Sequence, residues 1–400
     1  MAIQRFSFII HPLSINEIHN HPSYRWTKYL PDELVERSAA YMPPLFISKV
    51  KGIVSPSTGQ EVEGFLYALS ATPRQLLRHK PEFTYRRVLS AARSASRHGA
   101  KIIGLGAFTS VVGDAGHTIA ERSPIAVTSG NSLTAAAAVM AARVGVEKMG
   151  LSSLRDRCAM VVGATGSIGS AVSRMLAREV KSLVLISRTA EKVKALQQYI
   201  QAQYPSLQLE GGTSADAYLE NCEVIISATS AFGERILDIS KCKPGAVICD
   251  VARPQDLSPE EAALRPDVLV IDSGEIKLPG QVDVGYNIGL EQGVVFACMA
   301  ETILLTLEGR FEHYTLGRDF DLTKTEEMLR LFKKHGFQLA PLRSFNQPIS
   351  DIEFARKREM RQRMLQDEAF SKHVVEVAMK KIAGITPMAK GVKADKHALS

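Results

Sequence analysis

The sequence predicts an α/β protein with two successive domains and a helical C-terminal tail. Three features predict this architecture. Short apolar runs separated by turns fill the first 150 residues, which is typical of an N-terminal α/β domain. From Cys158 onward, apolar strands alternate with helical segments, the pattern of a parallel sheet with right-handed crossovers. Beyond residue 290 the patterns are helical, and the chain ends in a segment rich in Lys and Arg.

The N-terminal 150 residues contain the elements of a small sheet and two loops of small residues. Residues 6–10, 46–51 and 62–68 are β-like, and the turn at 55–59 makes a hairpin of the last two. A helix over 81–98 ends at Gly99, and a strand over 102–105 follows. The two loops are 104–110 and 128–131, and the second starts an Ala-rich helix that reaches about Met149.

Composition and charge narrow the class of protein. The chain has 400 residues, 45% hydrophobic and 23% charged, so it can bury a core without disulfide bonds. Its five cysteines form no CxxC pair, which favours reduced thiols in the cytoplasm and indicates no metal site. The apolar run at 6–10 is too short for a signal peptide, and Glu301 interrupts the apolar stretch 294–307, so no transmembrane segment is expected. The net charge of +7 suits an acidic partner, or it has no specific meaning in a chain of this length.

A glycine motif follows the first strand of the alternating region. Gly163, Gly166 and Gly169 form GxxGxxG between an apolar strand and a helix. In a dinucleotide-binding Rossmann fold the first glycine allows the tight turn, the second lets pyrophosphate approach the backbone, and the third permits close helix packing. The helix N-terminus then attracts the phosphates. The expected contacts with the cofactor come from Gly163, Ala164, Thr165, Gly166, Ser167, Ile168 and Gly169.

The end of the second strand indicates which dinucleotide binds. An NAD-preferring site has Asp or Glu there, but this chain has Ser187, Arg188 and Thr189. Arginine pairs with a 2′-phosphate, and the hydroxyls can add hydrogen bonds, so NADPH is the expected cofactor. Small residues that follow later strands are expected to line the same groove. These are Ala228, Thr229, Ser230 and Val251.

Cys298 is the candidate nucleophile. It lies in the predicted exit helix 292–307, which would pass the nicotinamide, whereas the other four cysteines sit in or near buried strands. Glu301 is three residues further on and shares its helix face, and a carboxylate in so apolar a helix needs a role or a partner. From spacing alone, core packing remains the more common explanation for Cys298.

Several segments, in order, resemble the long-chain acyl-[acyl-carrier-protein] reductases. The resemblance covers about residues 5 to 345. It rests on residues 107–110, 128–131 with Thr134, 161–172, 296–301, 304–305, 308–309, 317–318 and 335–337. A weaker similarity to shikimate dehydrogenase and glutamyl-tRNA reductase is carried by residues 187–189, 228–230 and 250–253.

The resemblance implies a function. In that family a cysteine of the exit helix, here matched by Cys298, takes the acyl group as an enzyme thioester, and NADPH reduces this thioester to a fatty aldehyde. The donor would be an acidic acyl carrier protein or acyl-CoA, with no nucleic acid involved. The resemblance also suggests a separate aldehyde-consuming enzyme downstream. The oligomeric state and acyl chain length are left open.

The expected mechanism assigns roles to two groups of residues. The Cys298 thiolate attacks the thioester, and Glu301 either assists proton transfer or orients its neighbours. Donors for the oxyanion are expected from the hydroxyl or backbone N–H groups of Thr109, Ser110, Ser129 and Asn131. The Ala-rich segment 135–142 would leave room for an acyl tunnel, or its alanines serve close helix packing.

The expected domains are an acyl-binding domain over 1–150 and the NADP-binding Rossmann domain over 151–290. Helices over 291–345 return to the N-terminal domain, and a basic helical or disordered tail covers 346–400. Two other functions stay open. One is a dehydrogenase of the shikimate-dehydrogenase type that acts on a small hydroxy or keto substrate. The other is a non-catalytic NADPH-binding sensor.

Overall fold

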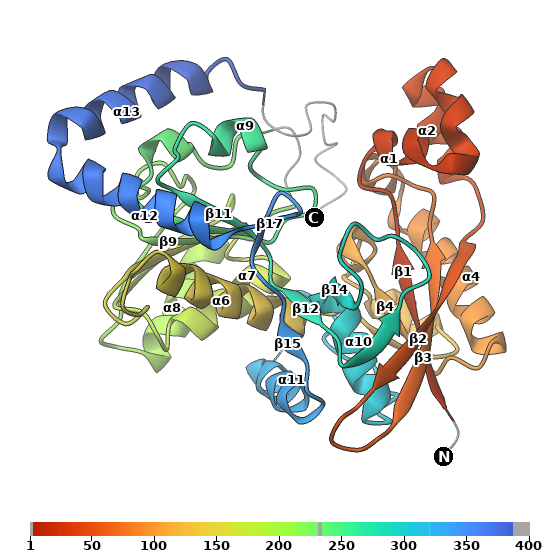
Figure 1. The fold of residues 1–400 in the computed structure, drawn as a ribbon. Helices are drawn as coiled ribbons and strands as arrows, with labels where there is room; N and C mark the ends of the chain where they lie inside the picture. Colours follow the sequence, from red (N-terminus) through yellow and green to blue (C-terminus); the bar gives the residue numbers. More distant parts are fainter. Residues whose placement is uncertain (1–2, 231–233, 320, 387–400) are drawn as a thin grey trace. The chain divides into compact units, whose positions relative to one another are not determined.

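The computed structural model describes residues 3–230, 234–319 and 321–386, in two compact units (Figure 1). Within these residues, unit 1 comprises 3–133 and 276–338, and unit 2 comprises 134–275 and 339–386. The first boundary therefore falls at 133/134, whereas a boundary near 150 was expected. The reason is that the body of helix α6 (Asn131–Lys148) packs on the sheet of unit 2: a Cβ on Gly145 would lie 2.9 Å from Val247.

Unit 1 is built on a six-stranded mixed sheet of order β13-β2-β3-β1-β4-β5. Strand β1 pairs in parallel with β3 and β4, and β4 with β5, whereas β2 runs antiparallel to β3 and to β13. The strands are β1 (Gln4–Ile10), β2 (Leu45–Val54), β3 (Glu61–Ala68), β4 (Ile102–Leu105), β5 (Ala126–Thr128) and β13 (Gly280–Asp283).

Alternate side chains of this sheet face two layers of helix. Ile9, Ile103 and Leu105 join a buried cluster with residues of α4 (Pro81–Arg97). The neighbouring residues Phe8 and Gly104 point to the opposite face of the sheet, toward α10 (Ala297–Leu307). Gly104 leaves room for this helix, since a Cβ there would stand 2.1 Å from Thr302 Oγ1. The remaining helices of unit 1 are α1 (Ile15–Asn20), η1 (Pro22–Tyr29), α2 (Asp32–Ala40), α3 (Pro73–Arg78), η2 (Ala107–Ser110), α5 (His117–Arg122) and α11 (Leu322–Lys334).

Unit 2 has the strand order that defines a Rossmann fold. Its six parallel strands follow the order β8-β7-β6-β9-β10-β11, which is 3-2-1-4-5-6 when the strands are numbered along the chain. The order reverses between β6 and β9, so ligands are expected beyond the carboxyl ends of these two strands. The strands are β6 (Cys158–Val162), β7 (Ser182–Ile186), β8 (Gln208–Gly212), β9 (Val224–Ser227), β10 (Val247–Asp250) and β11 (Leu269–Asp272). The predicted α/β fold class is confirmed. Of the six strands of this sheet, only β8 was not recognised in the sequence, since QLEGG is half exposed and ends in two glycines.

The C-terminal tail forms two ordered helices in unit 2, α12 (Asp351–Gln366) and α13 (Glu368–Ile382). Ile382 belongs to the buried cluster on one face of the Rossmann sheet. Arg235 donates to the carbonyl oxygens of Ile382 and Ile385 at 2.8 Å each. The tail is therefore part of the nucleotide-binding unit up to residue 386, and the predicted tail residues 387–400 lie outside the described residues.

Smaller elements complete the chain. Unit 2 also contains α7 (Ser167–Leu176), α8 (Ala190–Gln203), η3 (Ile239–Lys241) and α9 (Pro259–Ala262). A three-stranded sheet has the order β14-β12-β15, and β16 pairs with β17. These strands are β12 (Glu275–Lys277), β14 (Val294–Phe296), β15 (Gln338–Leu339), β16 (Arg343–Ser344) and β17 (Gln347–Pro348). Among the described residues, no helix is both long and apolar enough to cross a bilayer.

The exit helix starts later than predicted. Residues 294–296 form strand β14, and α10 begins at Ala297, not at residue 292. Gly293 has φ +77°, and the β-branched Val294 and Val295 favour a strand. The difference has a chemical consequence, since it moves Cys298 from the middle of a helix to the second residue of one.

Candidate functional site

The glycine loop of unit 2 joins β6 to α7. Gly163 has φ +80°, and a Cβ there would lie 2.6 Å from the carbonyl oxygen of Ala228. A Cβ on Gly169 would lie 2.1 Å from the carbonyl oxygen of Gly163, so this glycine allows α7 to pack against the turn. Gly166 differs in degree, because the nearest atom to its Cβ position is the Gly163 carbonyl oxygen at 3.3 Å. The geometry fits the tasks predicted for Gly163 and Gly169, and Gly166 is the glycine expected to face pyrophosphate.

The adenosine end of the groove carries a free cation. Arg188 follows β7, is exposed, and has no ion pair among the residues that the structure describes. Thr165 and Ser187 share a hydrogen bond of 2.5 Å between their hydroxyls, which ties the glycine loop to the end of β7. Thr189 is exposed beside them. A guanidinium and hydroxyls at this position fit a 2′-phosphate.

A second loop lines the same end of the sheet. Residues 228–230 follow β9 and lie against Gly163. Asp256 holds this loop, accepting hydrogen bonds from Ser227 and Thr229 at 2.5 Å and 2.6 Å. Burial raises the pKa of Asp256 and of its neighbour Asp250. Sequence reasoning missed Asp256, whereas Asp250 ends β10 and Val251 follows it, where the sequence placed them.

Cys298 of unit 1 is half-buried at the second residue of α10. Burial raises the pKa of its thiol to about 11, and the nearby Glu301 carboxylate adds to this. The backbone N–H groups of Met299, Cys298 and Ala107 act in the opposite direction and favour the anion. At neutral pH the resting group is therefore a thiol.

A strained turn supplies one of these donors. Ala107 opens η2 with φ +46°, a conformation that is uncommon outside glycine. His11 holds the turn, since its Nε2 accepts from the Phe108 N–H at 3.0 Å and its Nδ1 donates to the Pro12 carbonyl at 3.0 Å. Burial lowers the pKa of His11 to about 4, so the ring is neutral and both nitrogens are engaged. Sequence reasoning did not select His11, because a single histidine after a strand gives no signal.

Glu301 connects four segments of unit 1. Its Oε1 accepts from the Thr128 and Thr315 hydroxyls at 2.5 Å and 2.6 Å. Its Oε2 accepts from the Ser132 hydroxyl at 2.6 Å and from the Leu133 N–H at 2.9 Å. The side chain is fully buried, and Thr315 has φ +46°. With two donors on each oxygen, Glu301 orients its neighbours, the second of its two predicted roles.

The loop 128–131 touches the cysteine directly. Gly130 has φ +76°, and a Cβ there would stand 2.3 Å from both Cα and Cβ of Cys298. The close contact between Gly130 and Cys298 explains the sequence Thr-Ser-Gly-Asn of residues 128–131. Thr128 binds Glu301, the glycine permits the contact, and Asn131 begins α6.

The hydroxyls expected as oxyanion donors are engaged elsewhere. Thr109 Oγ1 donates to the Gly106 carbonyl and Ser110 Oγ to the Ala107 carbonyl, both at 2.7 Å. Ser129 Oγ donates to the Thr315 carbonyl. Each hydroxyl has a single hydrogen, so these three stabilise the loops, and the donors nearest Cys298 are backbone N–H groups. Asn131 is buried at the start of α6, where its own N–H lies 3.4 Å from Ser129 Oγ.

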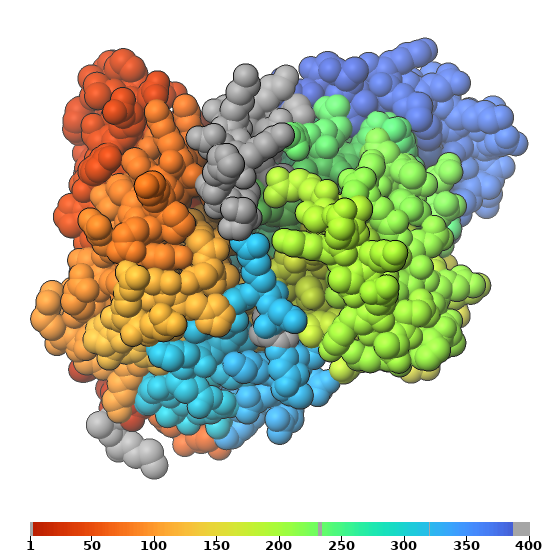
Figure 2. All heavy atoms as spheres, turned by 180° about the vertical axis from the view of Figure 1, so that it is seen from behind, coloured from red at the N-terminus to blue at the C-terminus, as the bar shows by residue number. Residues whose placement is uncertain are grey.

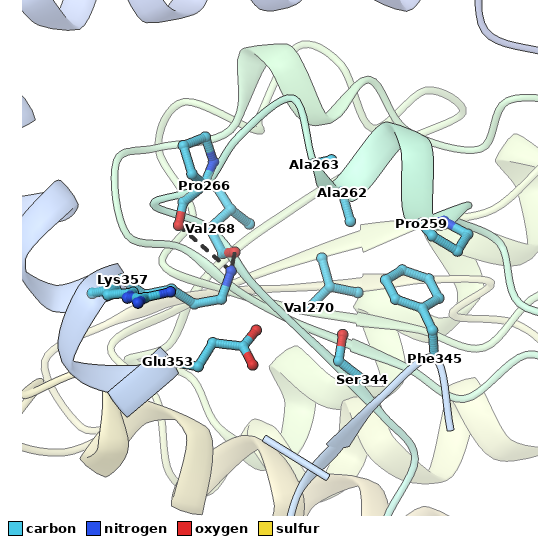
Figure 3. A pocket seen from close by; sticks show the side chains of 11 residues that line it. Pro259, Ala262, Ala263, Pro266, Val268, Val270, Ser344, Phe345, Glu353 and Lys357 are labelled. Atoms are coloured by element: carbon cyan, nitrogen blue, oxygen red, sulfur yellow. Dashed lines mark hydrogen bonds between the residues drawn. The ribbon is translucent and has the colours of Figure 1, made fainter. Parts of the chain in front are cut away.

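Two further features of unit 2 lie apart from the glycine loop. Cys158 and Cys222 place their sulfurs 3.2 Å apart, and the hydrogen bond from Cys222 lowers the pKa of the Cys158 thiol to about 7. A pocket of about 340 Å³ lies beside edge strand β11, between α9 and α12 (Figure 3). There Lys357 donates to the Val268 carbonyl at 3.0 Å, and no residue of the glycine loop lines the pocket.

The Ala-rich part of α6 serves close packing. Ala135–Ala138 are fully buried, and Gly274 lies so near that a Cβ there would stand 2.5 Å from the Ala137 carbonyl oxygen. From Thr134 onward this helix belongs to unit 2, so these alanines do not line a tunnel in the N-terminal domain.

Comparison with known proteins agrees with this division. The Shikimate / quinate 5-dehydrogenase family matches residues 146–276, which is most of the Rossmann part of unit 2. Together with the strand order, the glycine loop and Arg188, the match identifies unit 2 as an NADP(H)-binding domain, which confirms the predicted cofactor. The chain thus contains an NADP(H)-binding domain of the kind found in dehydrogenases.

Individual relatives extend over both units. Aminotransferase PigE from Serratia sp. is 32% identical over 363 residues, which cover 86% of this chain and 41% of PigE. The chain thus spans about two fifths of that relative. The long-chain acyl-[acyl-carrier-protein] reductase of Synechococcus elongatus is 26% identical over 311 residues, 74% of this chain and 87% of the reductase. Among solved structures, L-tryptophan dehydrogenase from Nostoc punctiforme covers 96% of this chain, with 88% of its own length aligned, 12% identity and a TM-score of 0.36.

Proposed function

We propose that this protein is an acyl-thioester reductase that releases a fatty aldehyde, with Cys298 as the covalent nucleophile and NADPH as the reductant. One observation carries the proposal. In a chain with an NADP(H)-binding domain, Cys298 lies half-buried at the start of α10, directly against Gly130 of the loop 128–131. The distant similarity to the Synechococcus acyl-[acyl-carrier-protein] reductase, which extends over most of that enzyme, supports the same chemistry.

The chemistry begins with acyl transfer. The sulfur of Cys298 forms a bond to the thioester carbonyl carbon, the bond to the donor thiol breaks, and the proton of Cys298 ends on that leaving thiol. Negative charge develops on the carbonyl oxygen meanwhile. Backbone N–H groups at the start of α10 and at Ala107 are suitable donors for this oxyanion, because they are fixed before the reaction.

Reduction completes the cycle. NADPH, when bound to the glycine loop, supplies a hydride to the acyl carbon, and the Cys298 sulfur leaves as the aldehyde forms. The proposal therefore requires the nicotinamide to reach the acyl group on Cys298 during turnover. Arg188 and the glycine loop contribute by binding the two ends of the nucleotide.

Acyl carrier protein or acyl-CoA is the proposed donor, and a separate enzyme would consume the aldehyde, which is reactive. Two other functions remain distinct from this proposal. A dehydrogenase acting on a small hydroxy or keto substrate would need no acyl-cysteine, and a sensor would bind NADPH without turnover.

Trapping the acyl-enzyme tests the proposal. The protein is incubated with palmitoyl carrier protein without NADPH, and intact mass and peptide mapping follow. We expect one palmitoyl group on Cys298, its release as hexadecanal when NADPH is added, and neither result with Cys298→Ala. Cys158→Ala is the matched control, because that thiol has the lower pKa and would acylate first if the reaction were non-specific.

The pH dependence gives a second test. Because the pKa of Cys298 is raised to about 11, the thiolate fraction and the acylation rate should rise about tenfold per pH unit between pH 7 and 9. Acyl transfer by Cys298→Ala at the wild-type rate would rule out the covalent mechanism. Oxidation of a hydroxy acid without any acyl adduct would favour the dehydrogenase.

A further inference from the structure

The segment from α1 to α2 of unit 1 exposes unusually many large apolar side chains. Tyr29 is 91% exposed and Trp26 61%, and Leu30 and Leu34 are 38% and 53% exposed. Figure 2 shows this segment in red, at one end of its unit. Scattered apolar residues are normal on a protein surface, but four within nine positions form a group that indicates an interaction surface.

The helix type arranges these side chains in rows. η1 is a 3₁₀ helix, in which side chains at i and i+3 eclipse each other. Trp26 and Tyr29 therefore form one exposed row, and Arg25 and Lys28 form a second exposed row beside it. The third row, Tyr24 and Thr27, faces the protein, where Thr27 is buried and lies 2.8 Å from His19. We call Arg25, Trp26, Lys28, Tyr29, Leu30 and Leu34 the aromatic–basic surface.

The charges of this surface are positive and unpaired. Arg25 and Lys28 have no ion pair within the described part of the chain. Two acids border the surface and have partners of their own: Asp32 lies 3.1 Å from His19 Nε2, and Glu33 lies 3.3 Å from Arg78. The charged side chains of the surface itself are both cations beside aromatic rings, which suits an anionic partner that can receive apolar groups.

We infer that the aromatic–basic surface binds the interface of an anionic lipid bilayer. Trp and Tyr partition to the headgroup level of membranes, and Lys and Arg beside them attract anionic lipids. The area argues against a stable protein partner. A fully buried aromatic side chain contributes about 150–250 Å², so four partly exposed side chains supply less than the about 800 Å² per partner of a standard protein interface. The inference does not depend on the reaction proposed above.

The sequence provides its own reporter for this inference. Trp26 is the single tryptophan among the 400 residues, so tryptophan emission reports only on this surface. The full-length protein is titrated with vesicles of pure phosphatidylcholine and with vesicles that also contain phosphatidylglycerol. We expect the emission to shift to the blue, and the protein to sediment, with the anionic vesicles only.

Substitutions in each row measure separately how much the basic side chains and the aromatic side chains contribute to vesicle binding. Each cation contributes about a fivefold factor in binding to an anionic surface, so Arg25→Glu with Lys28→Glu should weaken binding by more than tenfold. Tyr29→Ala should weaken it severalfold. Lys194→Glu and Ile352→Ala are matched controls, because these residues are exposed on α8 and α12 of unit 2.

Three outcomes would overturn the inference. The first is an emission that no vesicle changes, and the second is equal losses in the unit 2 controls. The third is a blue shift caused by an acidic carrier protein without lipid, which would assign the surface to a protein partner. Far-ultraviolet circular dichroism of each variant shows that it is folded, so a loss of binding cannot be ascribed to unfolding.

Discussion

The glycine loop of unit 2 and the cysteine site of unit 1 are constructed in opposite ways. The glycine loop is one continuous segment, 163–169, whose backbone N–H groups are expected to bind the phosphates of the dinucleotide. The cysteine site joins segments that are far apart in sequence. Glu301 of α10 binds Thr128, Thr315 and the start of α6, and His11, which follows β1, holds η2. A continuous site can change its ligand binding without affecting the rest of the fold. An assembled site is at the same time a part of the core, so its substitutions should cost stability first.

Glu301→Leu is the strongest test of this contrast. The substitution leaves four buried donors without an acceptor, and we expect the free energy of unfolding to fall by about 3–5 kcal/mol. Urea unfolding followed by circular dichroism measures it. Glu147→Leu, at an exposed position of α6, should change stability by less than about 0.5 kcal/mol. Equal effects of the two would show that Glu301 does not hold the site together.

His11 gives the cysteine site a pH dependence. Its pKa is about 4 in the folded protein and 6.5 in the unfolded chain, so the unfolded state binds more protons between these values. Its contribution is complete above pH 6.5 and is lost as the pH falls toward 4, a total of about 3 kcal/mol at about 1.36 kcal/mol per pH unit. Unfolding of wild type and His11→Asn across this range should show the dependence in wild type alone. Parallel curves would contradict the buried, neutral ring.

Arg188→Ala should affect nucleotide choice and leave folding unchanged. Loss of a charge-assisted hydrogen bond to the 2′-phosphate costs about 1.5–3 kcal/mol, so NADPH affinity should fall about tenfold to a hundredfold while NADH affinity stays the same. Isothermal titration calorimetry with both nucleotides measures this. Lys181→Ala, at the opposite end of β7, is the control. A parallel loss of NADH affinity would remove the assignment of Arg188 to the phosphate.

The smallest expected effect is a difference in thermal stability between alanine variants of two glycines in the same loop. Gly166→Ala places a Cβ 3.3 Å from the Gly163 carbonyl oxygen, so its thermal midpoint should fall only slightly below that of wild type while NADPH affinity falls about tenfold. Gly169→Ala places a Cβ 2.1 Å from the Gly163 carbonyl and should destabilise the fold itself. If both variants lost stability equally, the distinction between a ligand-facing and a packing glycine would be wrong.

Local patterns in the sequence were sufficient for the Rossmann unit. The GxxGxxG loop, the alternation of strands and helices and the cation after β7 are all encoded within short segments, so they could be predicted without a structure. The missed strand β8 is the exception, because its half-exposed residues carry little apolar signal.

The cysteine site was predictable only as a list of residues. Thr109, Ser110 and Ser129 were identified as members, but the direction of each hydroxyl depends on carbonyl groups brought close by folding. His11 acts through Phe108, which is 97 residues away, and no periodicity encodes such a pair. The start of α10 was misplaced because Val294 and Val295 fit an apolar helix and a short strand equally well.

The C-terminal helices have a consequence for how the protein is made. Ile382 completes a buried cluster whose other buried members lie between residues 160 and 270, and Arg361 of α12 packs on Gly245. During synthesis the strands of the nucleotide-binding unit therefore emerge from the ribosome more than a hundred residues before Ile382. That face of the sheet is expected to remain exposed and in need of a chaperone until α13 has been synthesised.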